Sequence, residues 1–323
     1  MLSEIKLLGR FLLLSLLLSV SSLYAADDPN AGLTVKDGIA TLEQVSEEAN
    51  QVLFKFYDYE KSIPLETRVV DHIEKEGFIR EKIVYRGVQG FWVPAYLQYP
   101  AKTTQPIPCV LLLHGWSGSK EHWWNDGGYL HGGEMRKSLL NAGYAVFAPD
   151  AQCHGDRIAV NDYAVVNHYA DPALGTSPRK GYFNQSEIYL QSVRDFRRAI
   201  DVLETRKEIN PKRIGSCGYS MGGAHTLMLM GVEPRIKVGV AAVPPAIRKQ
   251  LPQIAPQNFV RGLGDRPLRT IMGITDPLCP VEQARGLQAL MNPKTCDQVL
   301  IDAGHKLPES WVPQATEWLK KHL

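Results

Sequence analysis

The sequence predicts an α/β protein built on a mostly parallel central sheet with helices on both faces. From residue 108 onward, short apolar runs typical of buried strands alternate with segments of helical pattern, and this alternation is typical of a parallel sheet. Candidate catalytic residues follow several of these runs, at the strand ends where open α/β sheets place their chemistry. The 44% hydrophobic and 22% charged content is that of an ordinary globular protein.

The elements are expected in the following order. Residues 27–67 are polar with a helical pattern and are expected to pack on the flank of the domain. Residues 78–86 and 91–99 alternate between apolar and polar, which predicts an N-terminal antiparallel hairpin. A long helix is expected over residues 186–204. Further strands are expected at 108–113, 144–149, 212–217, 236–243, 268–274 and 297–301.

The N-terminus has the pattern of a secretory signal peptide. Lys6 and Arg10 precede an apolar run over residues 11–20, and small residues follow up to Ala25 and Ala26. An uncleaved anchor is the alternative, but the run is short for a span of about 20 residues. We therefore expect a signal peptide over 1–25 and a single exported domain over 26–323, periplasmic or extracellular, with no stable membrane insertion after cleavage.

Charge and cysteine content exclude several classes of protein. A net charge of +2 gives no basic footprint, so no nucleic-acid partner is expected. Five cysteines do not make a disulfide framework in a chain of this length, although a bridge between Cys279 and Cys296 is left open. The Cys/His spacing indicates no zinc site, and neither a metal nor a cofactor is expected. The sequence does not indicate an oligomeric state.

The most informative motif is Gly-Tyr-Ser-Met-Gly at residues 218–222. It follows an apolar run and precedes a segment that is expected to be a helix. A turn this tight requires glycines on both sides of the serine. The turn also lifts the serine side chain clear of the sheet. Ser220 is therefore the candidate nucleophile, and the backbone N–H of Met221 at the helix start is a candidate oxyanion donor.

Candidate partners for Ser220 follow two later strands. Asp276 comes after the strand at 268–274, and His305 comes after the strand at 297–301. A serine needs a base to accept its proton, which is the expected role of His305. Asp276 is expected to hold the imidazole in the correct tautomer. Asp302 is the main rival acid, and Asp265 and Glu282 are weaker rivals.

The chain resembles an α/β-hydrolase of the dienelactone hydrolase and acetyl xylan esterase type, related to the catalytic domain of prolyl oligopeptidases. The resemblance covers roughly residue 78 to the C-terminus and rests on segments 114–118, 148–150, 154–157, 218–223, 273–277 and 304–305. It implies the α/β-hydrolase fold. Dienelactone hydrolases proper have a cysteine as nucleophile; Ser220 at that position points to ordinary ester substrates.

The resemblance also implies the second oxyanion donor, the backbone N–H of Trp116 in the segment His-Gly-Trp-Ser-Gly at 114–118. His114 and His154 are interpreted as structural histidines of their loops. Arg157 is expected to form an ion pair with Asp156 or Asp150. Trp116 and Tyr219 are expected to contact the substrate.

Two segments interrupt the alternation of strand and helix, at residues 155–184 and 244–267. Both are rich in glycine or proline and are expected to form a partial lid over the pocket, with Trp116, Trp123 and Trp124. The expected function is an exported serine esterase that cleaves a short acyl group from a carbohydrate or aryl alcohol through an acyl-enzyme. The alternatives are a serine peptidase of prolyl-oligopeptidase type and a non-catalytic binding protein of the same fold.

Overall fold

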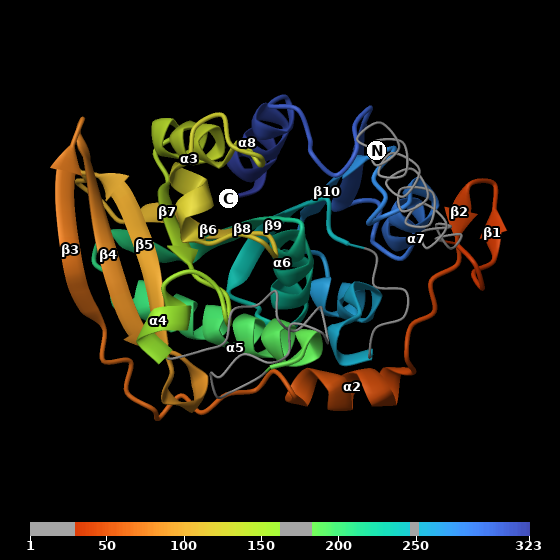
Figure 1. Ribbon diagram of the computed structural model, residues 1–323, viewed down its shortest axis with the longest axis horizontal. Helices are drawn as coiled ribbons and strands as arrows, with labels where there is room; N and C mark the ends of the chain where they lie inside the picture. The colour runs from red at the N-terminus through yellow and green to blue at the C-terminus, as the bar shows by residue number, and fades with distance from the viewer. Residues whose placement is uncertain (1–29, 162–182, 246–251) are drawn as a thin grey trace, which may run out of the picture.

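A nine-stranded sheet runs through the whole molecule (Figure 1). The computed structural model describes residues 30–161, 183–245 and 252–323. The strands lie in the order β11-β10-β9-β8-β6-β7-β5-β4-β3. Their bounds are β3 Arg68–Lys75, β4 Phe78–Arg86, β5 Trp92–Pro100, β6 Ile107–Leu113, β7 Ala145–Pro149, β8 Ile209–Tyr219, β9 Ile236–Ala242, β10 Leu268–Gly273 and β11 Cys296–Ile301.

The expected architecture is confirmed. Strands β6 to β11 are parallel to their neighbours among themselves, and β4 and β5 form the expected antiparallel hairpin. The hairpin joins the parallel part of the sheet where β5 pairs antiparallel with β7. Two short strands, β1 (Val35–Lys36) and β2 (Ile39–Ala40), pair separately.

Strand β3 was not expected from the sequence. It forms the outer edge of the sheet against β4, and all eight of its residues are exposed. The register with β4 shifts between Val69 and Asp71, which interrupts the alternation of apolar and polar residues. An exposed edge strand with charged residues and a bulge lacks the apolar alternation by which half-buried strands are identified.

Helices cover both faces of the sheet (Figure 1). Helices α3 (Gly132–Asn141) and α8 (Trp311–His322) lie together on one face. On the other face lie α5 (Gln185–Glu204) and α6 (Met221–Val232), with α2 (Glu47–Lys55) beyond them. The shorter elements are η1 Val88–Gly90, η2 Lys120–Trp124, α4 Arg157–Asn161, η5 Pro252–Ile254, η6 Pro256–Leu263 and α7 Val281–Ala289.

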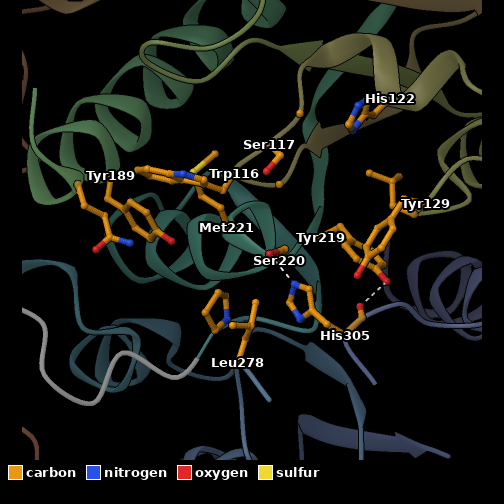
Figure 2. A pocket seen from close by; sticks show the side chains of 15 residues that line it. Trp116, Ser117, His122, Tyr129, Tyr189, Tyr219, Ser220, Met221, Leu278 and His305 are labelled. Atoms are coloured by element: carbon orange, nitrogen blue, oxygen red, sulfur yellow. Dashed lines mark hydrogen bonds between the residues drawn. The ribbon is translucent and has the colours of Figure 1, made fainter. Parts of the chain in front are cut away.

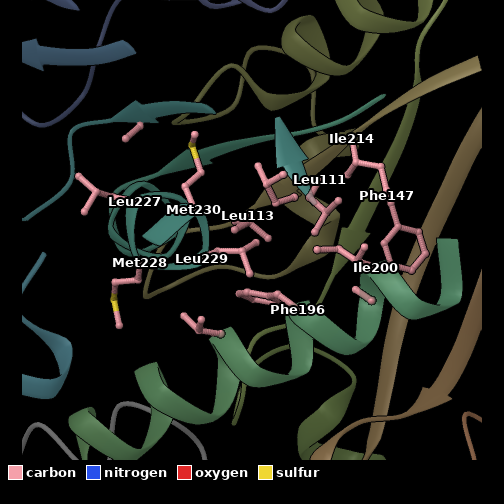
Figure 3. Packing of buried hydrophobic residues seen from close by; sticks show 14 of the residues in the cluster. Leu111, Leu113, Phe147, Phe196, Ile200, Ile214, Leu227, Met228, Leu229 and Met230 are labelled. Atoms are coloured by element: carbon pink, nitrogen blue, oxygen red, sulfur yellow. The ribbon is translucent and has the colours of Figure 1, made fainter. Parts of the chain in front are cut away.

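The two faces have separate apolar cores. Leu111 and Leu113 of β6 meet Phe196 of α5 and apolar side chains of α6 on one face (Figure 3). Val110 and Leu112, which alternate with them, face the α3 and α8 side. The continuous apolar run of β6 is therefore buried on both faces, as expected of a central parallel strand.

Helix α5 begins where the sequence predicts and is held there by a capping box. The side chain of Asn184 accepts a hydrogen bond from the Glu187 backbone, and the Glu187 side chain accepts one from the Asn184 backbone. Helix α6 is buried on all sides, which matches its uniformly apolar sequence after the serine.

The segments expected to form a lid are only partly described. Residues 162–182 and 246–251 lie outside the described residues, as does the expected signal peptide over 1–25. In the described part of 244–267, η6 packs against α6 and α2, and only Pro245 lines the pocket. Among the helices of the described ranges, none is long and apolar enough to cross a membrane.

Cys296 is a thiol whose Sγ lies 3.8 Å from the carbonyl oxygen of Arg266. The bridge to Cys279 that the sequence left open is therefore not formed. Cys109 and Cys217 are buried in β6 and β8, and burial raises the pKa of both thiols. They contribute to the core as small apolar side chains.

Candidate active site

Ser220 occupies a strained turn between β8 and α6. Its backbone dihedrals are φ 57° and ψ −120°, a conformation that costs energy for any residue except glycine. A Cβ on Gly218 would overlap the carbonyl of Gly222, and a Cβ on Gly222 would overlap the carbonyl of Leu113. The glycines of the motif are thus required because the strand, the turn and the oxyanion loop approach closely.

Ser220, His305 and Asp276 form one chain of hydrogen bonds. The Nε2 atom of His305 lies 2.8 Å from the Ser220 Oγ, and its Nδ1 atom lies 2.8 Å from the Asp276 Oδ2. The other carboxylate oxygen of Asp276 accepts the backbone N–H of Leu278 at 2.8 Å, which fixes the carboxylate. Figure 2 shows His305 directed at Ser220 from the loop after β11.

The rival acids lie elsewhere. Asp302 is exposed, and the Nδ1 atom of His305 is already bound to Asp276. Asp265 accepts a hydrogen bond from Asn292. Glu282 accepts one from Asn30. The structure therefore brings together the three residues that the sequence placed first.

The loop after β6 lies directly against the nucleophile. A Cβ on Gly115 would lie 3.3 Å from the Ser220 Cβ, which is a tight contact, so a glycine makes this close approach of the backbone easier. His114 holds the loop from within: its Nδ1 donates to the Gly115 carbonyl at 2.8 Å, and its Nε2 accepts the Ala151 N–H at 3.0 Å. His114 is thus a structural histidine, as the sequence indicates.

His154 fixes the same loop one residue further on. Its Nε2 lies 2.6 Å from the Trp116 carbonyl oxygen, and its Nδ1 lies 2.6 Å from that of Gln152. A neutral imidazole donates to one of these oxygens at a time. Burial lowers the pKa of His154 to about 4, although both carbonyls act in the opposite direction. His154 therefore holds the Trp116–Ser117 peptide, while the Gly115–Trp116 peptide, which carries the candidate Trp116 N–H donor, is held by His114 at the Gly115 carbonyl.

A buried ion cluster anchors the loop after β7. The Lys120 ammonium is fully buried and lies 2.9 Å from Asp150 and 2.8 Å from Asp156. The guanidinium of Arg157 pairs instead with the buried carboxylate of Asp195 on α5, at a distance of 2.7 Å. The expected pairing of Arg157 is therefore wrong, because the lysine fills that position.

A pocket of about 740 Å³ opens around Ser220. Trp116 and Tyr189 lie on one side of the serine, and Tyr129 and Tyr219 lie on the other (Figure 2). Of the tryptophans expected to cover it, only Trp116 lines the pocket; Trp123 is buried in the core, and Trp124 packs on Tyr96. The volume is typical of a site for a small organic molecule.

Several residues that line this pocket were not predicted from the sequence. They are His122, Tyr129, Leu130, Gln185, Tyr189 and Leu278. Tyr189 lies at the N-terminal end of the long helix, where it continues the helix's apolar face. Tyr129 lies in a glycine-rich loop, and no sequence pattern marks it as a pocket residue.

Tyr219 lines the pocket with its ring, but its hydroxyl does not point at a substrate. The side chain is 1% exposed, and the hydroxyl is bound to the backbone of His305 and Leu307. Its expected role in substrate binding is therefore limited to the ring. Within the described part of the chain, no group of three or more His, Cys, Asp or Glu side chains is arranged to hold a metal ion.

The fold and the site together define an α/β-hydrolase with a serine nucleophile turn. A model of the family described as "Dienelactone hydrolase family" matches residues 93–305, about two thirds of the chain. The chain belongs to this family and thereby to the carboxylic ester hydrolases.

Individual relatives are distant. The chain is 22% identical over 263 residues to "Esterase YjfP" of Escherichia coli (strain K12), covering 72% of this chain and 96% of that protein. It is 28% identical over 151 residues to "Putative hydrolase YtaP" of Bacillus subtilis (strain 168), a match that spans 46% of each chain, less than half of that relative. Acetyl xylan esterase 1 from Thermoanaerobacterium sp. JW/SL YS485 has a similar structure, with a TM-score of 0.64 at 14% identity over 87% of this chain and 95% of that one.

Proposed function

We propose that this protein is an exported serine esterase that removes a short acyl group from a carbohydrate or aryl alcohol through an acyl-enzyme. The observation that carries the proposal is the continuous hydrogen-bond chain from Asp276 through His305 to Ser220, which ends at the floor of an open pocket. Each member of this chain has the chemistry that its position requires.

In the acylation step, His305 Nε2 takes the proton of the Ser220 hydroxyl while Oγ attacks the ester carbonyl. Asp276 holds Nδ1–H and stabilises the imidazolium that forms. His305 then gives the proton to the leaving alcohol, and the ester's acyl group remains on Ser220. Water repeats the sequence to release the acid, with His305 again as base and then as acid.

The oxyanion that forms in both steps is stabilised by backbone donors. Met221 is the first residue of α6, so its N–H lies at the positive end of the helix. The candidate Trp116 N–H belongs to the peptide that follows Gly115, which lies against Ser220, and His114 holds the carbonyl of that peptide. Donors that are held in place before the reaction stabilise the transition state without reorganising.

The walls of the pocket support the proposed substrate class. Trp116, Tyr129 and Tyr189 offer aromatic surface on both sides of Ser220, suited to a sugar ring or an aryl group. The 740 Å³ volume exceeds the needs of an acetyl group alone and leaves room for the alcohol part of an ester. The similarity to an acetyl xylan esterase supports the same class.

Export is supported by the charged and apolar pattern of residues 1–25. The N-terminal sequence of the mature protein recovered from the periplasm or the medium tests this. It is expected to begin at Ala26 or Asp27. A protein that retains Met1 and stays with the cells would contradict export.

The activity is tested with p-nitrophenyl acetate, butyrate and longer esters, acetylated sugars, and an aminoacyl-p-nitroanilide. Rapid turnover of the short esters and the acetylated sugars is expected, without cleavage of the anilide. Ser220→Ala is expected to lose most of this rate and to retain only ~10³–10⁴-fold catalysis over water. Cleavage of the anilide would instead support a peptidase, and no hydrolysis of any of these substrates would support a binding protein.

A further inference from the structure

Tyr219 connects the nucleophile turn to the loop that carries His305. It is the last residue of β8, directly before Ser220, and its ring is buried. The ring packs against Trp311 at the start of α8, with the centroids 5.5 Å apart, and against His305, at 6.3 Å. Its position is therefore set by the sheet on one side and by α8 on the other.

The hydroxyl of Tyr219 makes two hydrogen bonds to this loop. It donates to the carbonyl oxygen of His305 at 2.9 Å and accepts the backbone N–H of Leu307 at 2.8 Å. Burial raises the pKa of the phenol, so the hydroxyl keeps the proton that it donates. One side-chain oxygen thus holds the backbone on both sides of Lys306.

Apart from these bonds, the backbone hydrogen bonds of the loop lie at its two ends, as far as the described residues go. The N–H of Thr275, after β10, donates to the Ala303 carbonyl at 3.1 Å. At the other end, the Trp311 N–H donates to the Pro308 carbonyl at 3.1 Å as α8 begins. Among the residues that the structure describes, the backbone of 304–307 finds its hydrogen-bond partner in the Tyr219 hydroxyl.

We propose that Tyr219 is a positioning residue, whose hydroxyl holds the His305 backbone so that the imidazole stays aligned between Ser220 and Asp276. This inference rests on the proposed function. Because Tyr219 and Ser220 are consecutive, the nucleophile and its base are tied to the same stretch of backbone. A small displacement of the turn then moves Ser220 and His305 together, so the hydrogen bond between them is preserved.

Tyr219→Phe removes the hydroxyl and keeps the ring. Without it, His305 has more freedom to leave the reactive geometry, and misplacement by about 1 Å costs a catalyst on the order of 100-fold in rate. We expect kcat on p-nitrophenyl acetate to fall about 10- to 100-fold, with KM within about twofold of wild type, because the pocket is unchanged. Unchanged kcat in the folded variant would overturn the proposal.

The matched control is Tyr85→Phe. Tyr85 is also fully buried, and its hydroxyl also donates to a backbone carbonyl, that of Asp195 at 3.2 Å, but on the hairpin side of the sheet. Its loss is expected to lower the stability by a similar amount and to leave kcat unchanged. An equal fall of kcat in both variants would show that Tyr219 acts through stability alone, and would overturn the proposal.

A double-mutant test separates positioning from other effects. In the background of His305→Ala, removal of the Tyr219 hydroxyl is expected to cost no further rate, because the group it positions is gone. A further 10-fold loss in that background would overturn the proposal. If His305→Ala itself retained full activity, the proposed function would fail; if His305→Ala were inactive and Tyr219→Phe fully active, only this inference would fail.

A measurement on the wild-type protein remains if Tyr219→Phe does not fold. Hydrogen exchange, resolved at the Leu307 amide by overlapping peptides, is expected to be slower than at the exposed Lys306 amide by a factor of at least 100. Equal exchange at the two amides would show that the hydroxyl does not hold the loop, and would overturn the proposal.

Discussion

His225 lies five residues beyond Ser220 on α6 and is completely buried between α6 and α5. Its ring packs edge-on against Tyr189, at 4.7 Å between centroids, and against Phe196, at 5.5 Å. Neither ring nitrogen has a hydrogen-bond partner among the described residues. Burial lowers the pKa of His225 to about 3, so the folded protein holds it neutral.

The perturbation is His225→Leu, which keeps the volume and removes both polar atoms. An unsatisfied buried polar group costs about 1–3 kcal/mol, and an imperfect fit of a similar-sized apolar side chain costs less than about 1.5 kcal/mol. At pH 7.5 we therefore expect the free energy of unfolding of His225→Leu to exceed that of wild type by about 0–2 kcal/mol.

The difference is expected to grow on acidification. The unfolded histidine titrates near 6.5 and takes up a proton as the pH falls below this value, whereas the folded one remains neutral until about pH 3. Above pH 6.5 the histidine is neutral in both states and does not change the free energy of unfolding with pH. Between pH 6.5 and 3 the unfolded state binds a proton that the folded state does not, so the free energy of unfolding falls as the pH falls. Between pH 7.5 and 5.5, protonation of His225 in the unfolded state alone is therefore expected to lower the free energy of unfolding by about 1.4 kcal/mol.

The assay is urea unfolding of both proteins at pH 7.5 and 5.5, followed by circular dichroism. Wild type is expected to lose about 1.4 kcal/mol more than His225→Leu over this interval, while both retain esterase activity at pH 7.5. Identical losses in the two proteins would refute the reasoning, because they would mean that His225 binds its proton equally well in the folded state.

Three further predictions concern the site and its support. Asp276→Asn is expected to lower kcat by up to ~10⁴-fold, because the imidazole then favours the wrong tautomer, whereas the exposed Asp302→Asn is expected to keep wild-type kinetics; the reverse result would exchange their roles. Lys120→Met is expected to cost about 3–5 kcal/mol of stability in urea unfolding, because it leaves Asp150 buried without its cation. Lys137→Met, which removes the exposed pair with Asp126, is expected to cost less than about 1 kcal/mol, and a similar loss in both would contradict the importance of burial. Gly222→Ala is expected to abolish soluble expression or activity, since its Cβ would overlap the Leu113 carbonyl; an active, stable variant would contradict the tight turn.

The sequence predicts the part of the fold in which local pattern and burial agree. The central parallel strands are buried on both faces and have continuous apolar runs, so β6 and its neighbours were expected within a few residues of where they lie. Strand β3 could not be identified in this way, because its exposed, charged residues carry no burial pattern and its bulge breaks the alternation.

The same contrast applies to the site. Ser220, Asp276 and His305 follow predicted strands, so topology alone brings them to one edge of the sheet. The role of the Tyr219 hydroxyl depends on a loop that returns 86 residues later in the sequence, and no local pattern encodes that approach. The Arg157 pairing failed for a similar reason, because its partner Asp195 comes from the long helix and not from its own loop.

The central claim is that Ser220 is the nucleophile and that His305 activates it. Reaction of the folded wild-type protein with a fluorophosphonate, followed by peptide mass spectrometry, tests this most directly. We expect a single adduct on Ser220, formed at least 100 times more slowly in His305→Ala and absent in Ser220→Ala. An adduct on another residue, or equally rapid labelling without His305, would contradict the account.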